Sequence, residues 1–139
     1  MLFSHFQKSG ILYLFLKQYY KSIIIGGLIV WLSLSGSQTA IPGRFLEIPY
    51  VDKIGHFAMY AFFSAILLLD SGRWQYSGNF HYLALLIPVV FGALMEVLQM
   101  TLTTTRKAEV LDLAADVGGV AAGILLAFIA KRILKAVRS

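Results

Sequence analysis

The chain contains no cysteine, only three prolines and few charged residues. The absence of cysteine excludes disulfide bonds, thiolate chemistry and cysteine-ligated zinc. Only 14% of the 139 residues are charged, whereas 58% are hydrophobic and the mean hydropathy is +0.75. No soluble domain needs so much apolar surface. The composition therefore indicates an integral membrane protein that is too short to carry a large catalytic domain outside the membrane.

Acidic residues are also scarce, with seven Asp and Glu against twelve Lys and Arg. In a soluble protein, the resulting net charge of +5 would suggest nucleic-acid binding. In a membrane protein the same excess reflects topology, because basic residues collect in the cytoplasmic loops. We therefore expect the lipid bilayer, and no nucleic acid, as the main partner.

The apolar segments predict an all-α, polytopic membrane protein with four transmembrane helices. The predicted helices span residues 22–35, 53–69, 80–102 and 110–129. Asp52 is a suitable N-cap for the second helix, and the loop after that helix is expected at residues 70–78.

Residues 1–20 are either a short N-terminal interfacial helix or the cytoplasmic start of the first span. Residues 21–131 form the transmembrane domain, and residues 132–139 form a basic cytoplasmic tail. A signal peptide cleaved after Ala40 is the alternative for the N-terminal part, although Gln38 is large for its place in a cleavage site.

Four spans place both termini on the same side of the membrane. That side would carry eight basic residues, namely Lys8, Lys17, Lys21, Arg73, Lys131, Arg132, Lys135 and Arg138. The opposite side would carry Arg44, Lys53, Arg106 and Lys107. The positive-inside rule then predicts a multi-pass protein of the cytoplasmic (inner) membrane with both termini in the cytoplasm.

Polar residues are paired along three of the predicted helices. Each pair is three or four residues apart and so lies on one helix face: Asp52 with His56, Glu96 with Gln99, and Asp112 with Asp116. At a bilayer centre one charged side chain costs roughly 2.5 to 3.5 kcal/mol even on the mildest scale. We therefore expect the three pairs to form one internal cluster near the external face, with Arg106 in the loop above it.

These residues follow a recognisable order along the chain. An Asp-Lys-x-x-His motif precedes Glu-x-x-Gln, Arg and Asp, which here are Asp52-Lys53-Ile54-Gly55-His56, Glu96, Gln99, Arg106 and Asp112. In this order, and in the Gly119 region, the chain resembles the VanZ-like membrane proteins over about residues 20–131. One position departs, because Asp116 stands where the family usually has asparagine. The family takes its name from a protein associated with low-level resistance to the glycopeptide teicoplanin, so the resemblance implies a role in the cell envelope.

One hypothesis for function is an enzyme in which His56, Glu96 and Asp112 carry out acid–base chemistry. The other polar residues would bind the substrate: Asp52, Lys53, Tyr60, Gln99, Arg106 and Asp116. A lipid-linked cell-wall precursor or a phospholipid could reach such a site laterally from the bilayer. The sequence contains no nucleophile motif and no phosphate-binding glycine loop, and it assigns no cofactor.

Other hypotheses use the same residues without turnover. The cluster could recognise a lipid-linked envelope component, or it could be a structural network that joins the helices. Asp52, His56, Glu96 and Asp112 could also hold manganese, iron or zinc, because these metals accept mixed carboxylate and imidazole ligands. The oligomeric state stays open, since the small residues of the fourth helix could pack within the bundle or between copies. That stripe consists of Ala115, Gly119, Gly123 and Ala127.

Overall fold

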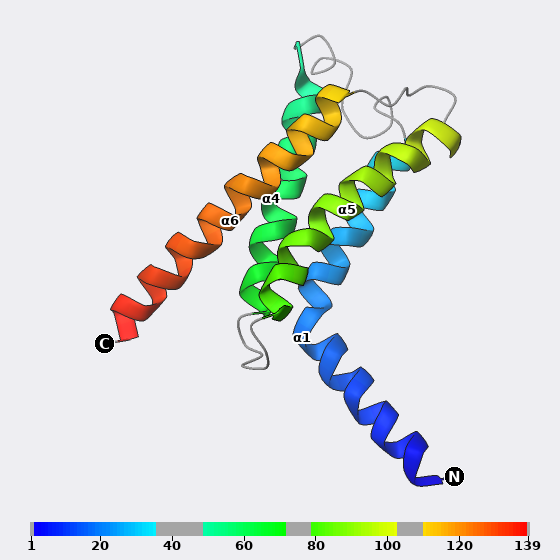
Figure 1. The fold of residues 1–139 in the computed structure, drawn as a ribbon, viewed down its shortest axis with the longest axis vertical. Helices are drawn as coiled ribbons and strands as arrows, with labels where there is room; N and C mark the ends of the chain where they lie inside the picture. Colours follow the sequence, from blue (N-terminus) through cyan, green and yellow to red (C-terminus); the bar gives the residue numbers. More distant parts are fainter. Residues whose placement is uncertain (1, 36–48, 72–78, 103–109, 139) are drawn as a thin grey trace.

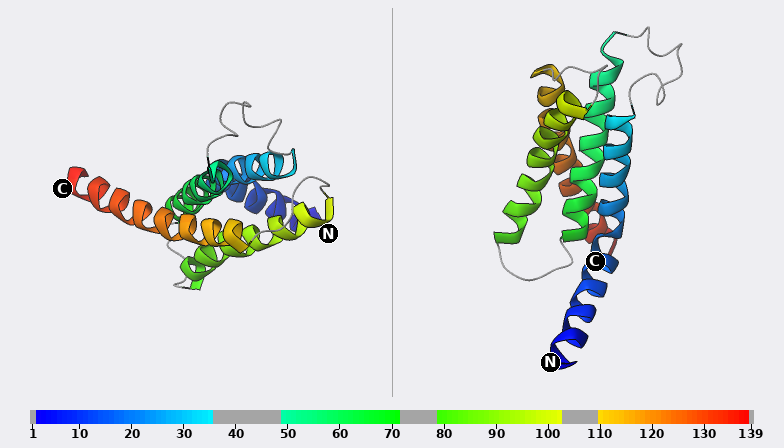
Figure 2. Two further views of the ribbon diagram at one scale, coloured as in Figure 1. Left: turned by 90° about the horizontal axis from the view of Figure 1, so that it is seen from above. Right: turned by 90° about the vertical axis from the view of Figure 1, so that its right-hand side faces the viewer.

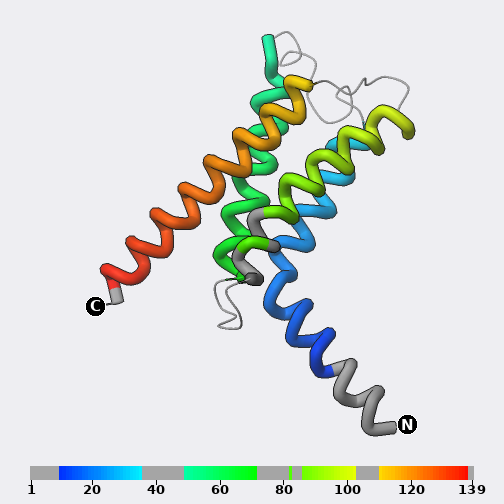
Figure 3. The backbone as a smooth tube through the Cα atoms, viewed as in Figure 1, coloured from blue at the N-terminus to red at the C-terminus, as the bar shows by residue number. Residues whose placement is uncertain are grey.

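The computed structural model describes residues 2–35, 49–71, 79–102 and 110–138. These ranges contain four helices and no strand, which are α1 (Leu2–Leu34), α4 (Val51–Ser71), α5 (Asn79–Leu102) and α6 (Val110–Arg138). Figure 3 follows the backbone through them. The predicted all-α class is confirmed for the described residues.

Successive helices run in opposite directions (Figure 1). The end of α1, the start of α4, the end of α5 and the start of α6 lie together at the upper end of the bundle in that view. Both chain termini lie toward the other end. The polar residues near 52–56, 96–99 and 112–116 therefore share the upper end, which we call the polar end.

Helix α4 is the centre of the bundle because it packs against each of the other three helices, most extensively against α6. The second view of Figure 2 shows α1 and α4 lying side by side. Two groups of buried apolar residues fill the interior. One surrounds Tyr60, Phe63 and Met95 near the polar end, and the other joins Tyr19 to Leu68 near the opposite end.

The close packing of α6 against α4 depends on glycine. A Cβ atom at Gly119 would collide with the carbonyl oxygen of Phe57, and one at Gly123 would collide with the carbonyl oxygen of Ala61. Ser64 Oγ of α4 also lies 3.3 Å from the carbonyl oxygen of Val120. Small residues allow helix backbones to approach in this way. These glycines of the predicted small-residue stripe therefore pack within the bundle and set the position of α6 along α4.

Two helices within the described residues, α4 and α6, are long and apolar enough to cross a membrane. Their 21 and 29 residues correspond to about 32 and 44 Å of helix, compared with a hydrocarbon core of about 30 Å. The described apolar part of α5, Leu86–Leu102, is shorter. Length and composition thus support two of the four predicted spans.

The start of α4 differs from the prediction in a small but informative way. The helix begins at Val51, so Asp52 lies in its first turn and is not the N-cap. The carbonyl oxygen of Tyr50 accepts the amide hydrogen of Ile54 at 3.0 Å, and Tyr50 has a φ of 60°. Tyr50 therefore occupies the capping position, while the charge of Asp52 still favours the positive end of the helix dipole.

Two predicted helix ends are wrong, because both predictions place a boundary at a charged residue. Helix α4 continues through Asp70 to Ser71, and Asp70 is buried within the bundle. Helix α6 continues past residue 129 to Arg138. Lys and Arg are good helix formers, and Arg132 lies over the ring of Phe128 at 4.6 Å, so nothing in the tail stops the helix.

The N-terminal helix is continuous from Leu2 to Leu34, so no break separates an interfacial segment from the predicted first span. The third helix was predicted correctly to within one residue at its start. The possible cleavage position at Ala40, most of the loop at 70–78 and Arg106 lie outside the described residues.

Candidate functional site

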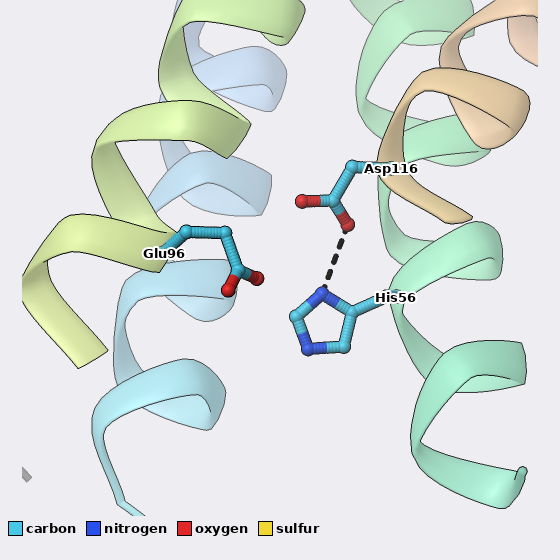
Figure 4. A group of neighbouring side chains, drawn as sticks. All are labelled: His56, Glu96 and Asp116. Atoms are coloured by element: carbon cyan, nitrogen blue, oxygen red, sulfur yellow. Dashed lines mark hydrogen bonds and ion pairs between the residues drawn. The ribbon is translucent and has the colours of Figure 1, made fainter. Parts of the chain in front are cut away.

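Three ionisable side chains from three helices meet inside the polar end. His56 comes from α4, Glu96 from α5 and Asp116 from α6, and Figure 4 shows all three pointing into the space between these helices. Their exposed fractions are only 2%, 7% and 1%. One ligand-type atom from each residue lies within 4.8 Å of the others. We call these three residues the buried triad.

His56 and Asp116 form the direct contact within the buried triad. Nδ1 of His56 lies 2.9 Å from Oδ1 of Asp116, a hydrogen bond that is an ion pair when the imidazole is protonated. The other oxygen of Asp116 points toward the Glu96 side in Figure 4. Neither Oδ2 of Asp116 nor Nε2 of His56 has a hydrogen-bond partner among the described residues. The pair therefore keeps one acceptor and one imidazole nitrogen available for a ligand.

Tyr60 and Gly92 complete the surroundings of Asp116. Tyr60 lies one turn below His56 on α4, is fully buried, and its hydroxyl has no hydrogen-bond partner among the described residues. A Cβ atom on Gly92 of α5 would lie 3.0 Å from Oδ2 of Asp116 and 3.3 Å from the ring of Tyr60. Glycine at this position therefore allows α5 to pack closely against the carboxylate and the ring, and a side chain would have to displace one of them.

A second group of charged residues lies about one helical turn nearer the N-terminal ends of α4 and α6 than the triad. Nζ of Lys53 lies 2.7 Å from Oδ2 of Asp52 and 2.9 Å from Oδ1 of Asp112. The side chain of Asp52 is 40% exposed, whereas those of Lys53 and Asp112 are largely buried. We call these residues the outer charge group. The lysine lies between two carboxylates and compensates their charge locally.

The structure thus separates the predicted cluster into two layers. His56 and Glu96 lie in the buried triad together with Asp116, and Asp112 lies with Lys53 in the outer charge group. The predicted metal-ligand set of Asp52, His56, Glu96 and Asp112 is not brought together, because Asp116 replaces both Asp112 and Asp52 beside the imidazole. Asp112 and Asp116 share a face of α6, but a helical turn of about 5.4 Å separates them.

Two other predicted site residues behave differently. Nε2 of Gln99 donates a hydrogen bond of 3.1 Å to the carbonyl oxygen of Ser33, so this side chain reaches α1. Arg106, predicted above the cluster, lies outside the described residues. Sequence reasoning did not find Gly92, which faces Asp116 across the helix interface. Its place one turn before Glu96 on the same helix was the available signal, and a single glycine in an apolar run is easily assigned to packing.

A comparison with models of protein families shows to which family the chain belongs. The family model described as VanZ/LLP1 matches residues 29–131, which is most of the chain and includes every described site residue. The chain belongs to the VanZ/LLP1 family. Comparisons with curated proteins and with solved structures found no match.

Membership of the VanZ/LLP1 family agrees with the resemblance inferred from the polar motif. Together with the two apolar helices of membrane-spanning length, it indicates a membrane protein. In this VanZ/LLP1 chain, the carboxylate of Asp116 is the hydrogen-bond partner of His56. The family match by itself assigns no reaction, so the chemistry has to be argued from the site.

Proposed function

We propose that this VanZ/LLP1 protein crosses the cytoplasmic membrane four times, with both termini in the cytoplasm and the polar end facing outward. Stripes of exposed apolar side chains at helical spacing support spans by α1 and α5 as well. They include Ile24, Leu28 and Trp31 of α1 and Leu86, Val90 and Leu94 of α5. Such stripes suit contact with lipid chains, because lipid cannot satisfy polar groups and water disfavours large apolar surfaces.

We further propose that the protein binds a lipid-linked component of the cell envelope at the buried triad. The observation that carries this proposal is a set of buried polar atoms, on His56, Tyr60 and Asp116, that lie together at the polar end and have no partner among the described residues. Buried polar atoms of this kind are costly unless a ligand satisfies them. A polar head group that enters from the membrane surface can supply the missing hydrogen bonds.

An apolar groove supports the lipid character of the proposed ligand. The groove holds about 500 Å³ between α1, α4 and α5, and it is lined almost entirely by apolar and aromatic side chains. Phe91 lines this groove, and its ring centroid lies 6.5 Å from that of Tyr60 beside the triad. The groove shares no lining residue with the triad, so a hydrocarbon chain would pass the rings of Tyr60 and Phe91 to extend from a head group at the triad into the groove.

Acid–base chemistry on the same ligand is the second candidate function. It is favoured by the hydrogen bond between His56 and Asp116, because a carboxylate on one imidazole nitrogen orients the ring and leaves the other nitrogen for proton transfer. In this case His56→Ala should bind the lipid-linked precursor and fail to convert it. A binding protein without turnover would yield no product with either the wild type or the variant.

The topology is tested by cysteine labelling, since the natural chain contains no cysteine. Val110→Cys lies at the polar end and Val137→Cys near the other end, and both positions are exposed. A membrane-impermeant maleimide should label Val110→Cys in intact spheroplasts, and Val137→Cys only after the membrane is opened. Labelling of Val137→Cys in intact spheroplasts would overturn the proposed orientation.

The ligand proposal is tested with purified protein in lipid nanodiscs. Native mass spectrometry should detect binding of lipid-linked cell-wall precursors to the wild type and much weaker binding to Asp116→Ala. Asp70→Asn is the matched control, because Asp70 is also a buried acid but lies near the opposite end of α4. Equal binding to all three proteins, or binding to none of them, would contradict the proposal. In cells, expression of the wild type should lower sensitivity to teicoplanin, and Asp116→Ala should not.

A further inference from the structure

The buried triad has the ligand types of a metal site, and its ligand atoms lie within 4.8 Å of one another. We propose that His56, Glu96 and Asp116 together bind one divalent transition-metal cation such as Zn²⁺, Mn²⁺ or Fe²⁺. These metals accept mixed imidazole and carboxylate ligands, whereas Mg²⁺ and Ca²⁺ favour oxygen ligands alone. The inference deepens the proposed function, and it rests on that function only for what the cation would do with a lipid.

The geometry is close to that of a bound site. Each of the three residues offers a ligand atom, and these atoms lie within 4.8 Å of one another. Metal–ligand distances of about 2.0 to 2.2 Å allow ligand atoms to be at most about 4.4 Å apart. A small change in side-chain torsions would therefore close the three ligands around a cation. The side chains come from three different helices, so such a cation would also join α4, α5 and α6.

The charge of the triad is a second observation, separate from the spacing of its ligand atoms, that favours a bound cation. Two carboxylates and a neutral imidazole carry a total charge of −2, and burial makes their mutual repulsion severe. Protons on the triad or a bound cation can relieve this repulsion. A divalent cation neutralises the two negative charges and leaves the imidazole in the neutral form that binds metals. In the outer charge group, the carboxylates of Asp52 and Asp112 share the ammonium group of Lys53.

The atoms without partners also indicate a ligand. Nε2 of His56, Oδ2 of Asp116 and the hydroxyl of Tyr60 are all buried and have no hydrogen-bond partner among the described residues. The side chains of His56 and Asp116 are 3% and 2% exposed, so bulk water does not reach them freely. A Cβ atom at Gly92 would lie 3.0 Å from Oδ2 of Asp116, so this glycine lets α5 approach the carboxylate closely. A cation with a bound water or head-group oxygen would bring the Tyr60 hydroxyl into use as a hydrogen-bond donor.

Three protein ligands would leave at least one coordination position open. In zinc proteins, three protein ligands plus an open position are typical of sites that bind a substrate or water, whereas structural sites use four. The open position suits an oxygen of a phosphate or carboxylate in the head group of the proposed lipid ligand. The cation would thereby explain how a site with two carboxylates attracts an anionic head group.

Metal binding can be measured without any lipid. Purified protein in detergent, treated with a chelator and then dialysed, is titrated with Co²⁺ while its visible absorption is recorded, and then with Zn²⁺ in competition. We expect about one Co²⁺ per chain with d–d bands that Zn²⁺ removes. Asp116→Asn and His56→Ala should each weaken Co²⁺ binding by about 100-fold or more, because each loses a direct ligand.

Asp70→Asn is the matched control and should bind Co²⁺ like the wild type. Gly92→Ala keeps all three ligands but places a methyl group about 3.0 Å from Oδ2 of Asp116, and we expect the displaced carboxylate to weaken binding and alter the Co²⁺ spectrum. Circular dichroism and gel filtration identify any variant that fails to fold, and Glu96→Gln then replaces it as the nearly isosteric test. A wild-type protein without saturable Co²⁺ binding, or a His56→Ala variant that binds normally, would overturn the metal site in favour of a protonated network.

The same proteins separate this inference from the proposed function. Lipid-linked precursor is added to chelator-treated and to Zn²⁺-loaded wild type, and binding is measured by native mass spectrometry. Metal binding without lipid binding would support the site and contradict the proposed function. Lipid binding to protein that takes up no metal would support the proposed function and contradict the metal site. Lipid binding that increases about tenfold or more on Zn²⁺ loading would support both.

Discussion

Asp70 and Asp116 are both buried acids in the same helical bundle, yet their surroundings differ. Oδ2 of Asp70 accepts a hydrogen bond of 2.9 Å from Oγ of Ser22, and Nζ of Lys21 lies 4.0 Å from its other oxygen. The backbone carbonyl of Asp70 also accepts a hydrogen bond from the side chain of Gln18. All these partners belong to α1, so the Asp70 network joins α1 to α4.

Asp116 has a single described hydrogen-bond partner, His56, and its second oxygen has none. It also lies near another buried carboxylate, that of Glu96. The Asp70 network satisfies its own polar groups and has the properties of a structural contact. Among the described residues, His56 and Asp116 keep buried polar atoms without a partner, and Asp116 lies near a second buried carboxylate, which is typical of a site kept for a ligand at some cost to stability.

The largest expected effect comes from disrupting the close packing of α6 against α4, which brings Asp116 to His56. Gly123→Val should lower the free energy of unfolding by about 3 kcal/mol, because the new side chain would collide with Ala61 and Ser64 of α4. Thermal unfolding in detergent measures the loss. Gly27→Val is the control, since nothing lies within 4 Å of a Cβ at that exposed glycine. Equal melting of the two variants would show that close contact of α4 and α6 is not needed.

The second-largest effect is expected when the Asp70 network between α1 and α4 is disrupted. Asp70→Ala should reduce stability by about 1 to 3 kcal/mol, because Ser22 and other polar groups on α1 lose their buried acceptor. Ser22→Ala removes only one contact of the Asp70 carboxylate and leaves Lys21 near its other oxygen, so it should cost less, about 1 kcal/mol. Chemical unfolding followed by fluorescence compares the two. A stable Asp70→Ala protein would mean that this network does not hold α1 to α4.

In the buried triad, removal of a carboxylate is expected to leave the stability unchanged or to increase it, whereas removal of Asp70 should decrease it. Asp116→Asn keeps the size of the side chain but removes one of two neighbouring negative charges. In metal-free protein the melting temperature should therefore stay the same or rise, by the equivalent of about 1 kcal/mol or less. The measurement is thermal unfolding in the presence of a chelator. A loss as large as that of Asp70→Ala would identify the triad as a structural network after all.

The smallest effect is expected in the outer charge group. Lys53→Gln removes the cation between Asp52 and Asp112, but Asp52 is 40% exposed, so solvent compensates part of the loss. We expect a cost of about 1 kcal/mol or less, and a smaller one in high salt. Thermal unfolding at two salt concentrations tests this. A larger cost that does not depend on salt would place Lys53 among the buried structural contacts.

Much of the fold could be predicted from the sequence because the helices are apolar and contain few interruptions. The four segments and the start of α6 at Val110 follow from apolar runs and from helical spacing. Two helix ends were wrong because a charge such as Asp70 or Lys131 suggests a boundary, whereas a charge with a buried partner or a long side chain can remain within a helix. Whether Asp70 meets Ser22 depends on a contact across 48 residues of chain.

The sequence alone determined that acids and a histidine share faces of their helices, since residues four apart in an α-helix lie one above the other. It could not decide whether Asp112 or Asp116 meets His56, because both lie on the same face of α6. The tertiary structure made that choice through Gly119 and Gly123, which bring α6 against α4 at one register. A shift of one turn along that contact would exchange the two acids, and only backbone packing between helices distant in sequence excludes it.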